Sequence, residues 1–567
     1  MTSTFPPPLS SPVPPAVANL EARRPQMFPT LSEAQIARLA RIGVEKKLGA
    51  GEILFDQGQA NVPMYVVLEG EVEVVHPLDK GEEPVTVHMP GEFTGEMSML
   101  ADRKALVRGR ARTPLRVLCV TPTDLHRIVR TDAELSELFM RAFILRRMAL
   151  LAGDYGDAVV VGSQYSASTL RVQAFFTRNG HPYRYVDVDR DPNIQGLFDT
   201  FHVTVADVPI LICRGERVLK NPSNAEVVDC LGLNQGIEPK IVHDLVICGG
   251  GPAGLAAAVY AASEGLDVLV LEESAPGGQA GTSSKIENYL GFPTGISGQA
   301  LAARALAQAE KFGAKFAIAQ SATRLRCDKV PFEIEVEGRE PALARAVIVA
   351  TGVEYRKLEI PNLVRFEGVG VYYGATNIEA QRCQADEVIV IGGGNSAGQA
   401  ATFLSRSSRR VYMLVRGAQL AAGMSRYLIQ RIEETPNIEL HLRTRVVALE
   451  GGETLERVTW IDEATAERTT RDVCHVFSMA GAVPNTRWLD GCLAMDDKGF
   501  VLTGPALSAE SLKRAGWSQA RAPFLFETSR PRVFAVGDVR ADSVKRVASA
   551  VGEGSVCVQM VHKAVAE

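Results

Sequence analysis

Two glycine-rich segments in this chain of 567 residues have the composition and spacing of loops that bind nucleotide phosphates. The first follows an apolar, β-branched run and precedes a run of small residues, so we expect it to connect a buried strand to a helix. Gly249 would permit the tight turn, Gly251 would let the backbone approach a pyrophosphate, and Gly254 would let the helix pack against the strand. The N–H groups at the start of that helix would then bind the phosphates.

An acidic residue completes the first predicted dinucleotide site. The next apolar strand, at 267–271, ends at Glu272, where a carboxylate can accept hydrogen bonds from both ribose hydroxyls. A strand, a glycine loop, a helix, a second strand and an acid in this order are typical of a dinucleotide-binding fold.

The second glycine segment has the same arrangement, with Gly392, Gly394 and Ala397 at the three key positions. Its next strand is followed by Arg416 and by no acid. A guanidinium would attract the 2′-phosphate of NADPH, whereas a carboxylate would repel it. A solvated surface arginine explains Arg416 equally well, so the choice between NADPH and NADH stays open.

From residue 242 to 567 the chain resembles low-molecular-weight thioredoxin reductases, which are FAD- and NAD(P)-dependent pyridine nucleotide-disulfide oxidoreductases. Further segments carry this resemblance, at 276–279, 286–289, 349–352, 481–486, 533–538 and 545–554. The resemblance implies that FAD contacts Gln279, Asn288, Gly352 and Asp538.

The resemblance also implies two Rossmann-type three-layer domains. The FAD domain would consist of two segments, 242–356 and 483–567, with the NAD(P) domain inserted at 357–482. Hydride would pass from NAD(P)H to FAD, and a homodimer is expected by analogy.

The chain departs from the family where the redox-active Cys-Ala-Thr-Cys should lie. Gly374 and Asn377 stand at the positions of the two cysteines. Dithiol exchange needs a thiolate and a resolving thiol, so no catalytic residue is predicted here. Cys383 is a single cysteine nearby, and we expect it to be packed and inert.

The final electron acceptor therefore stays open among oxygen, a quinone and another external acceptor. Two alternatives to this oxidoreductase remain. One is a regulatory or sensor flavoprotein without turnover, and the other is a thioredoxin-disulfide reductase that uses other thiols.

The nine cysteines are scattered, with no CxxC pair and no metal-ligand spacing. We expect them to be unpaired and the protein to lie in the reducing cytoplasm, since no signal peptide is evident. No metal is predicted.

Residues 155–236 resemble a thioredoxin or glutaredoxin domain, with the order strand, helix, strand, helix, strand, strand, helix. Pro209 matches the cis-proline of that family. Ser163 and Ser166 stand where the redox CxxC would be, and an aliphatic hydroxyl cannot replace a thiolate. We expect Ser163 to cap the first helix and the domain to serve as a docking module or spacer.

The N-terminal part begins with a proline-rich, flexible tail at 1–27. A capping box from Thr30 to Glu33 predicts a helix that extends to residue 42. Short strands separated by glycine turns then predict a small β-roll, followed by helices, within a domain at 28–152.

This β-roll resembles a cyclic-nucleotide-binding domain. Gly95 and Glu96 match the start of the family's phosphate-binding segment, and Arg103 is the nearest candidate for its phosphate-binding arginine. The loop before Arg103 is short, so nucleotide binding and a role as an interaction module both remain open.

Composition limits the classes of partner. The net charge of −5 and the absence of an evident basic face disfavour nucleic-acid binding. We also expect no membrane partner, because no uncharged apolar span is long enough to cross a bilayer. The predicted fold class is a multidomain α/β protein made of the β-roll, the thioredoxin-like domain and the two Rossmann-type domains.

Overall fold

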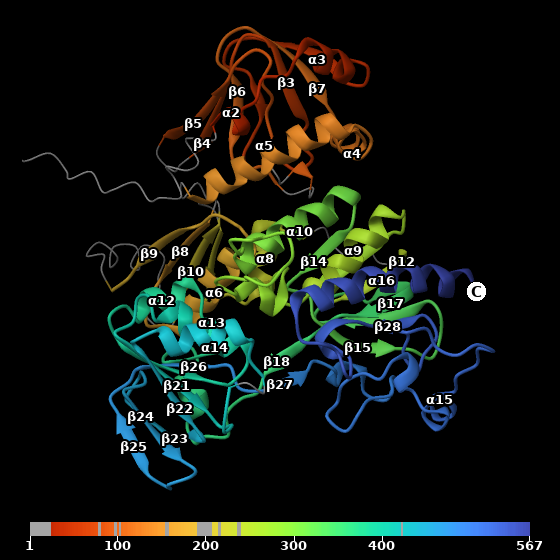
Figure 1. The fold of residues 1–567 in the computed structure, drawn as a ribbon. Coiled ribbons are helices and arrows are strands. Elements are labelled where there is room, and N and C mark those ends of the chain that lie inside the picture. The colour runs from red at the N-terminus through yellow and green to blue at the C-terminus, as the bar shows by residue number, and fades with distance from the viewer. Residues whose placement is uncertain are drawn as a thin grey trace, which may run out of the picture. The chain divides into compact units, whose positions relative to one another are not determined.

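The computed structural model describes residues 24–77, 81–95, 99–100, 104–152, 158–189, 207–213, 217–234, 240–420 and 423–567. The chain divides into two compact units, one formed mainly by residues before 160 and the other mainly by the residues after it. Figure 1 labels the elements of both units. Most of the predicted proline-rich tail lies outside the described residues.

The first unit is built on two small antiparallel sheets, as predicted. One sheet has the strand order β1 (Val44–Leu48), β7 (Leu115–Val120), β3 (Met64–Glu69). The other has the order β2 (Ile53–Phe55), β6 (Arg108–Ala111), β4 (Val72–Pro77), β5 (Glu82–His88). The helices are α2 (Arg24–Met27), α3 (Glu33–Ala40), α4 (Pro122–Thr131) and α5 (Ala133–Ala152). Phe139 and Phe143 of α5 are fully buried against Phe93, which closes the core of this unit.

The predicted capping box of the first helix is wrong by two residues. Ser32, and not Thr30, is the N-cap of α3 and accepts a hydrogen bond from the Gln35 backbone N–H at 3.3 Å. The Gln35 side chain accepts the reciprocal bond from the Ser32 backbone N–H at 2.8 Å. Glutamine serves at the third helical position as well as glutamate does, so two overlapping capping patterns were present in the sequence.

The second unit begins with a small α/β domain, which we call the middle domain (described residues within 158–234). Its four-stranded sheet has the order β11 (Arg217–Lys220), β10 (Ile210–Cys213), β8 (Ala158–Gly162), β9 (Arg184–Asp187). Its helices are α6 (Ala167–Arg178) and α8 (Asn224–Leu231). The Val208–Pro209 bond is cis, as predicted, and the second predicted helix falls largely outside the described residues. The likeness to thioredoxin stays a prediction.

The predicted cap of α6 is also wrong. Ser166 is the N-cap and accepts from the Thr169 backbone N–H at 3.3 Å. The Ser163 hydroxyl instead accepts from the Tyr165 backbone N–H at 3.1 Å and donates to Asp189 at 2.8 Å. The helix begins at Ala167, so Ser166 directly precedes it and takes the capping position.

The predicted flavin domain contains one seven-stranded sheet that is built from two chain segments. Its strands are β12 (Val242–Cys248), β13 (Val268–Glu272), β14 (Lys315–Ile318), β15 (Ala322–Arg326), β16 (Phe332–Val336), β17 (Ala342–Val349) and β28 (Val533–Ala535). Its helices are α9 (Pro252–Ser263), α10 (Gly298–Phe312), α15 (Ala509–Ala515) and α16 (Val547–Ala566). β28 from the second segment pairs in parallel with β17 from the first, and α16 lies beside α9 (Figure 1).

Between these segments lies a second Rossmann-type domain, which we call the inserted domain. Its parallel sheet has the order β19 (Val371–Tyr372), β26 (His475–Ser478), β20 (Glu387–Ile391), β21 (Arg410–Val415), β22 (Ile438–Leu442). The helices are α11 (Leu363–Phe366), α12 (Asn377–Arg382), α13 (Asn395–Leu404) and α14 (Arg426–Glu434). A three-stranded antiparallel sheet adds β23 (Thr444–Glu450), β24 (Arg457–Asp462) and β25 (Arg468–Arg471). The two connections to the flavin domain form an antiparallel pair, β18 (Val353–Tyr355) with β27 (Ala482–Pro484).

The middle domain packs against both of its neighbours through α6. Leu170, near the start of α6, is buried in the core cluster of the inserted domain together with Tyr372 and Ala375. At the other end of the helix, the Gln299 side chain of the flavin domain donates to the Thr177 carbonyl at 2.6 Å. The second unit is therefore a packed assembly of three α/β domains.

The expectation of unpaired cysteines is wrong. Cys213 and Cys230 form a disulfide within the middle domain, and Cys327 and Cys492 form a second one within the flavin domain. Disulfide bonding depends on the distance between Cα atoms, which is 6.4 Å and 6.0 Å for the two pairs, and not on proximity in sequence. The partners are 17 and 165 residues apart, so no short motif could reveal them.

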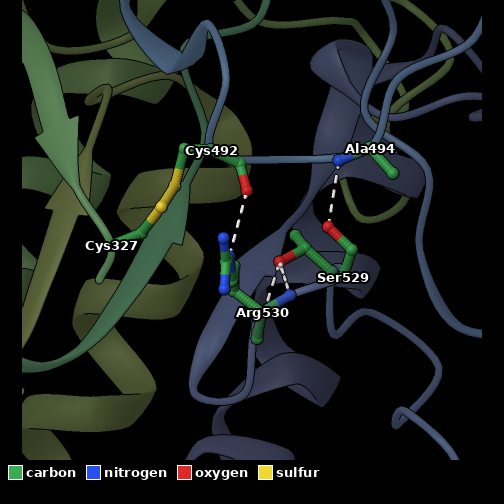
Figure 2. Close-up of a disulfide and its surroundings, with 6 residues drawn as sticks. Cys327, Cys492, Ala494, Ser529 and Arg530 are labelled. Atoms are coloured by element: carbon green, nitrogen blue, oxygen red, sulfur yellow. Dashed lines mark hydrogen bonds between the residues drawn. A yellow bond between two sulfur atoms is a disulfide. The ribbon is translucent and has the colours of Figure 1, made fainter. Parts of the chain in front are cut away.

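The second disulfide joins the two segments of the flavin domain. Cys327 follows β15 in the first segment, and Cys492 belongs to the second. Figure 2 shows Arg530 beside this bond, with its Nε donating to the Cys492 carbonyl at 3.3 Å. The whole inserted domain therefore lies between the two bonded cysteines in the sequence.

Among the described helices, none combines the length and apolar character that a membrane crossing requires. In the same part of the chain, no group of three or more metal-ligating side chains comes together.

Candidate functional site

A cavity of about 500 Å³ in the second unit is lined by residues from all three of its domains. The predicted FAD-contacting residues lie together around it, namely Gly249, Gly251, Glu272, Gln279, Asn288, Gly352 and Asp538. Gly254 does not line the cavity. The sequence therefore identified residues from both segments of the flavin domain that converge on one site.

The first glycine loop has the backbone geometry that phosphate binding requires. Gly249 adopts a φ of +111°, and a methyl group added there would lie 2.3 Å from the Ala350 carbonyl oxygen. A methyl group at Gly254 would lie 1.9 Å from the Gly249 carbonyl oxygen, so only glycine allows α9 to approach the loop. Gly251 is the N-cap of α9 and has no side-chain cap, which leaves the first N–H groups of the helix for a ligand.

Glu272 is buried at the end of β13, and its carboxylate organises the loop. One oxygen accepts from the Gly250 backbone N–H at 2.7 Å, and the other accepts from the N–H groups of Ser274 at 2.9 Å and Ala275 at 3.1 Å. Burial raises the pKa of Glu272, while these three hydrogen bonds and the nearby Arg178 act in the opposite direction. The predicted acid thus has a structural role in addition to its predicted contact with the ribose.

Asp538, in the second segment, lies at the cavity near the start of α16. Burial raises the pKa of Asp538, and the positive charge of Lys545 opposes that shift. The Lys545 ammonium donates to the Asp538 carbonyl at 2.5 Å, and the neighbouring Gly537 N–H donates to Glu553 at 2.7 Å. These bonds fix the turn that presents Asp538 to the cavity.

The inserted domain contributes part of the cavity wall, from the segment predicted to replace the family's dithiol. Gly374 and Ala375 line the cavity, and a methyl group added to Gly374 would meet no atom within 4 Å. Asn395 and Ser396, which begin α13 directly after the second glycine loop, line the same cavity. The structure therefore brings Gly374 and the first residues of α13 to the predicted flavin site.

Three of the four residues predicted to bind the nicotinamide nucleotide lie in the second loop and the first turn of α13. Gly392 has a φ of +140°, and a methyl group there would lie 2.7 Å from the Met479 carbonyl oxygen. Gly394 is the N-cap of α13, and Ala397 is buried within its first turn. Arg416 is exposed after the end of β21. None of these four residues lines the cavity, so their role in binding stays a prediction.

Tyr355 and Arg178 are among the cavity residues that sequence reasoning missed. Tyr355, at the end of β18, lines the cavity, and burial raises the pKa of its hydroxyl, while a hydrogen bond with Ser396 opposes the shift. Arg178, the last residue of α6, reaches the cavity from the middle domain. No local pattern could have identified Arg178, because the surrounding sequence carries no cofactor motif.

In the first unit, Gly95 is the only residue of the predicted cyclic-nucleotide site that the structure describes. Its carbonyl accepts a hydrogen bond from Arg146 of α5 at 2.8 Å. Arg146 also donates to the Met27 carbonyl at 2.9 Å and stacks over Phe93. Glu96 and Arg103 lie outside the described residues.

The fold and the cavity agree with the comparisons to known families. Residues 243–554 match the pyridine nucleotide-disulphide oxidoreductase family, and residues 45–132 match the cyclic nucleotide-binding domain. The first match covers more than half of the chain, so the protein belongs to the pyridine nucleotide-disulphide oxidoreductases.

Within that family the similar proteins are thioredoxin reductases. The chain is 30% identical to the thioredoxin reductase of Listeria monocytogenes over 327 residues, which is 58% of this chain and 95% of the relative. It is 34% identical to that of Treponema pallidum over 313 residues, 55% of this chain and 94% of the relative. The crystal structure of Lactococcus lactis thioredoxin reductase, at 28% identity, covers 57% of this chain and 99% of that chain with a TM-score of 0.51.

The predicted enzyme class and cofactors are thereby confirmed. The protein is an oxidoreductase of the thioredoxin reductase type, and this family uses FAD and NADPH. The site fits FAD on its own geometry, because the crowded glycine loop, the open N-terminus of α9 and the buried Glu272 surround one cavity.

Proposed function

We propose that this protein is an FAD-dependent NAD(P)H oxidoreductase that delivers electrons to an acceptor other than the family's redox dithiol. The observation that carries the proposal is the presence of Gly374 at the cavity, at a position where the family resemblance implies a redox cysteine. Cys248 is the one cysteine that lines this cavity, and burial raises the pKa of its thiol to about 12. A thiol with so high a pKa cannot supply the thiolate that disulfide exchange needs.

The protein's own residues would bind and orient the cofactor. The N-terminus of α9 would hold the diphosphate, and Glu272 and Asp538 would fix the two ends of the bound molecule. FAD, once bound, supplies the two-electron chemistry. The open space beside Gly374 would admit a small acceptor such as oxygen or a quinone, because no atom lies within 4 Å of a methyl group placed there.

An anaerobic titration tests this function. Purified protein is titrated with NADPH and then NADH while the flavin absorbance is followed, and loss of the oxidised flavin band is the expected result. Reduced protein is then mixed with oxygen, a water-soluble quinone or thioredoxin. Rapid reoxidation by oxygen or the quinone supports the proposal, whereas reoxidation by thioredoxin alone would favour a disulfide reductase that uses other thiols.

The cyclic nucleotide-binding domain favours a second function, in which a nucleotide controls the flavin site. The bond from Arg146 to Gly95 supports this idea, because it ties α5 to the start of the predicted phosphate-binding segment. Cyclic AMP and cyclic GMP are tested for binding by calorimetry and for an effect on the rate of flavin reduction. Binding with an altered rate supports gating, and binding to a protein whose flavin is never reduced would make it a sensor.

A cytoplasmic location and a homodimer complete the proposal. The location rests on the requirement for NAD(P)H alone, because the two disulfides remove the argument from unpaired cysteines, and the dimer rests on analogy with the family. Light scattering of the purified protein measures the mass, with a monomer arguing against the analogy. Fractionation of the cells that make the protein tests the location.

A further inference from the structure

Arg178 is a cation that the middle domain places at the wall of the flavin cavity. It is the last residue of α6, and its two terminal nitrogens donate to the Ser274 hydroxyl and the Gly278 carbonyl, each at 3.3 Å. Both acceptors belong to the flavin domain, in the loop that follows Glu272. The guanidinium is therefore placed by one domain and held by another.

The charge of Arg178 is poorly compensated in its surroundings. Both of its hydrogen-bond acceptors are neutral and at long distance, and no described carboxylate forms an ion pair with it. Burial lowers the pKa of Arg178, and the charge of Glu272 offsets that shift only in part. Buried charges in proteins are normally paired, whereas among the described residues this guanidinium has no ion-pair partner.

A phosphate group bound at the first glycine loop would lie near Arg178, because Arg178 is next to that loop. A methyl group added to Gly278 would lie 3.1 Å from the Cα of Gly251, the N-cap of α9. The adjacent Gly277 N–H also donates to the Gly250 carbonyl at 2.7 Å. Arg178 and the N-terminus of α9 therefore line the same part of the cavity.

We propose that Arg178 binds the diphosphate of FAD, so that the middle domain completes the cofactor site of the flavin domain. A guanidinium can donate two hydrogen bonds to phosphate oxygens, and it complements the N–H groups of α9 on the same group. This inference rests on the FAD-binding part of the proposed function and is independent of the electron acceptor. It gives the middle domain a role that needs no redox cysteine.

Docking contacts on both sides of Arg178 hold it in position. The Asn179 side chain donates to the Ser274 carbonyl at 3.2 Å, and the Thr177 carbonyl accepts from Gln299 at 2.6 Å. Because the same helix end makes the docking contacts and the phosphate contact, FAD binding and docking of the middle domain stabilise each other.

Binding measurements on the full-length apoprotein test the proposal. Dissociation constants for FAD and for ADP are measured by calorimetry for the wild type, Arg178→Gln and Arg178→Lys. Arg171→Gln is the matched control, because Arg171 lies on the same helix and makes two hydrogen bonds within the middle domain without lining the cavity. Loss of a charge-assisted contact to phosphate is expected to weaken both ligands about ten- to a hundredfold in Arg178→Gln.

Further readouts separate this contact from a general loss of structure. Arg178→Lys should retain part of the affinity because it retains the charge, and the Arg171→Gln control should bind both ligands as the wild type does. The increase in thermal midpoint that a fixed concentration of ADP produces, relative to each ligand-free protein, should shrink in Arg178→Gln and not in Arg171→Gln. Binding of FAD and ADP by Arg178→Gln within twofold of the wild type would overturn the proposal, and so would equal weakening by Arg178→Gln and Arg171→Gln.

Discussion

Removal of the Cys327–Cys492 disulfide should be more destabilising than removal of the Cys213–Cys230 disulfide. The bond closes a loop of 165 residues, because it joins the two segments on either side of the inserted domain. Chain-entropy arguments give about 5 kcal/mol for a loop of this length and about 3 kcal/mol for a loop of 17 residues. At about 3 °C per kcal/mol for a domain of this size, Cys327→Ser/Cys492→Ser should lower the midpoint of flavin release by about 10–15 °C.

Flavin fluorescence during heating measures that midpoint, because FAD becomes strongly fluorescent when it leaves the protein. Cys213→Ser/Cys230→Ser is the control, since its shorter loop lies in the middle domain and should produce a smaller shift. Thiol titration of the denatured protein should find five thiols before reduction and nine after it. Nine thiols before reduction, or equal midpoints for the wild type and Cys327→Ser/Cys492→Ser, would refute the reasoning.

Three further predictions concern separate parts of the chain. Gly254→Ala should weaken FAD binding at least about tenfold in a calorimetric titration, because its methyl group would meet a loop carbonyl at 1.9 Å. The control Gly552→Ala in α16 places its methyl group in open space and should bind FAD as the wild type does. Burial lowers the pKa of His88 to about 4 from 6.5, so the unfolded chain takes up the proton first as pH falls. The first unit should therefore lose about 3 kcal/mol of stability between pH 6.5 and 4. Thermal unfolding across that pH range should show this loss, and His88→Gln should flatten the dependence. Gly374→Cys/Asn377→Cys should gain thioredoxin-linked disulfide reductase activity in a coupled assay, and Gly374→Cys alone should not, because exchange needs a resolving thiol.

The flavin site could be predicted from the sequence where short-range geometry determines the residue type. Gly249 is favoured by its positive φ in the turn, Gly254 is fixed by its contact with Gly249, and Glu272 ends the very next strand. Each of these requirements leaves a pattern within one strand–helix–strand unit, and that pattern can be read without knowing the rest of the fold.

Contacts between distant segments left no such pattern. Arg178 meets the cavity only because the middle domain docks on the flavin domain, and Cys327 meets Cys492 only because two segments form one sheet. The cap at Ser166 was missed because two serines, Ser163 and Ser166, lie one turn apart and either could cap the helix.

Helix α6 makes the middle domain a mechanical link between the two nucleotide domains. It has 12 residues and is therefore about 18 Å long, with Leu170 near one end buried in the core of the inserted domain and Arg178 at the other end in the flavin cavity. A helix this short behaves as a stiff rod. If the inserted domain turns and keeps Leu170 buried, the guanidinium must leave the cavity wall. If the guanidinium stays, Leu170 must be exposed at a cost of about 2 kcal/mol. Rotation of the inserted domain and retention of the cofactor by the flavin domain therefore oppose each other, because α6 connects the two.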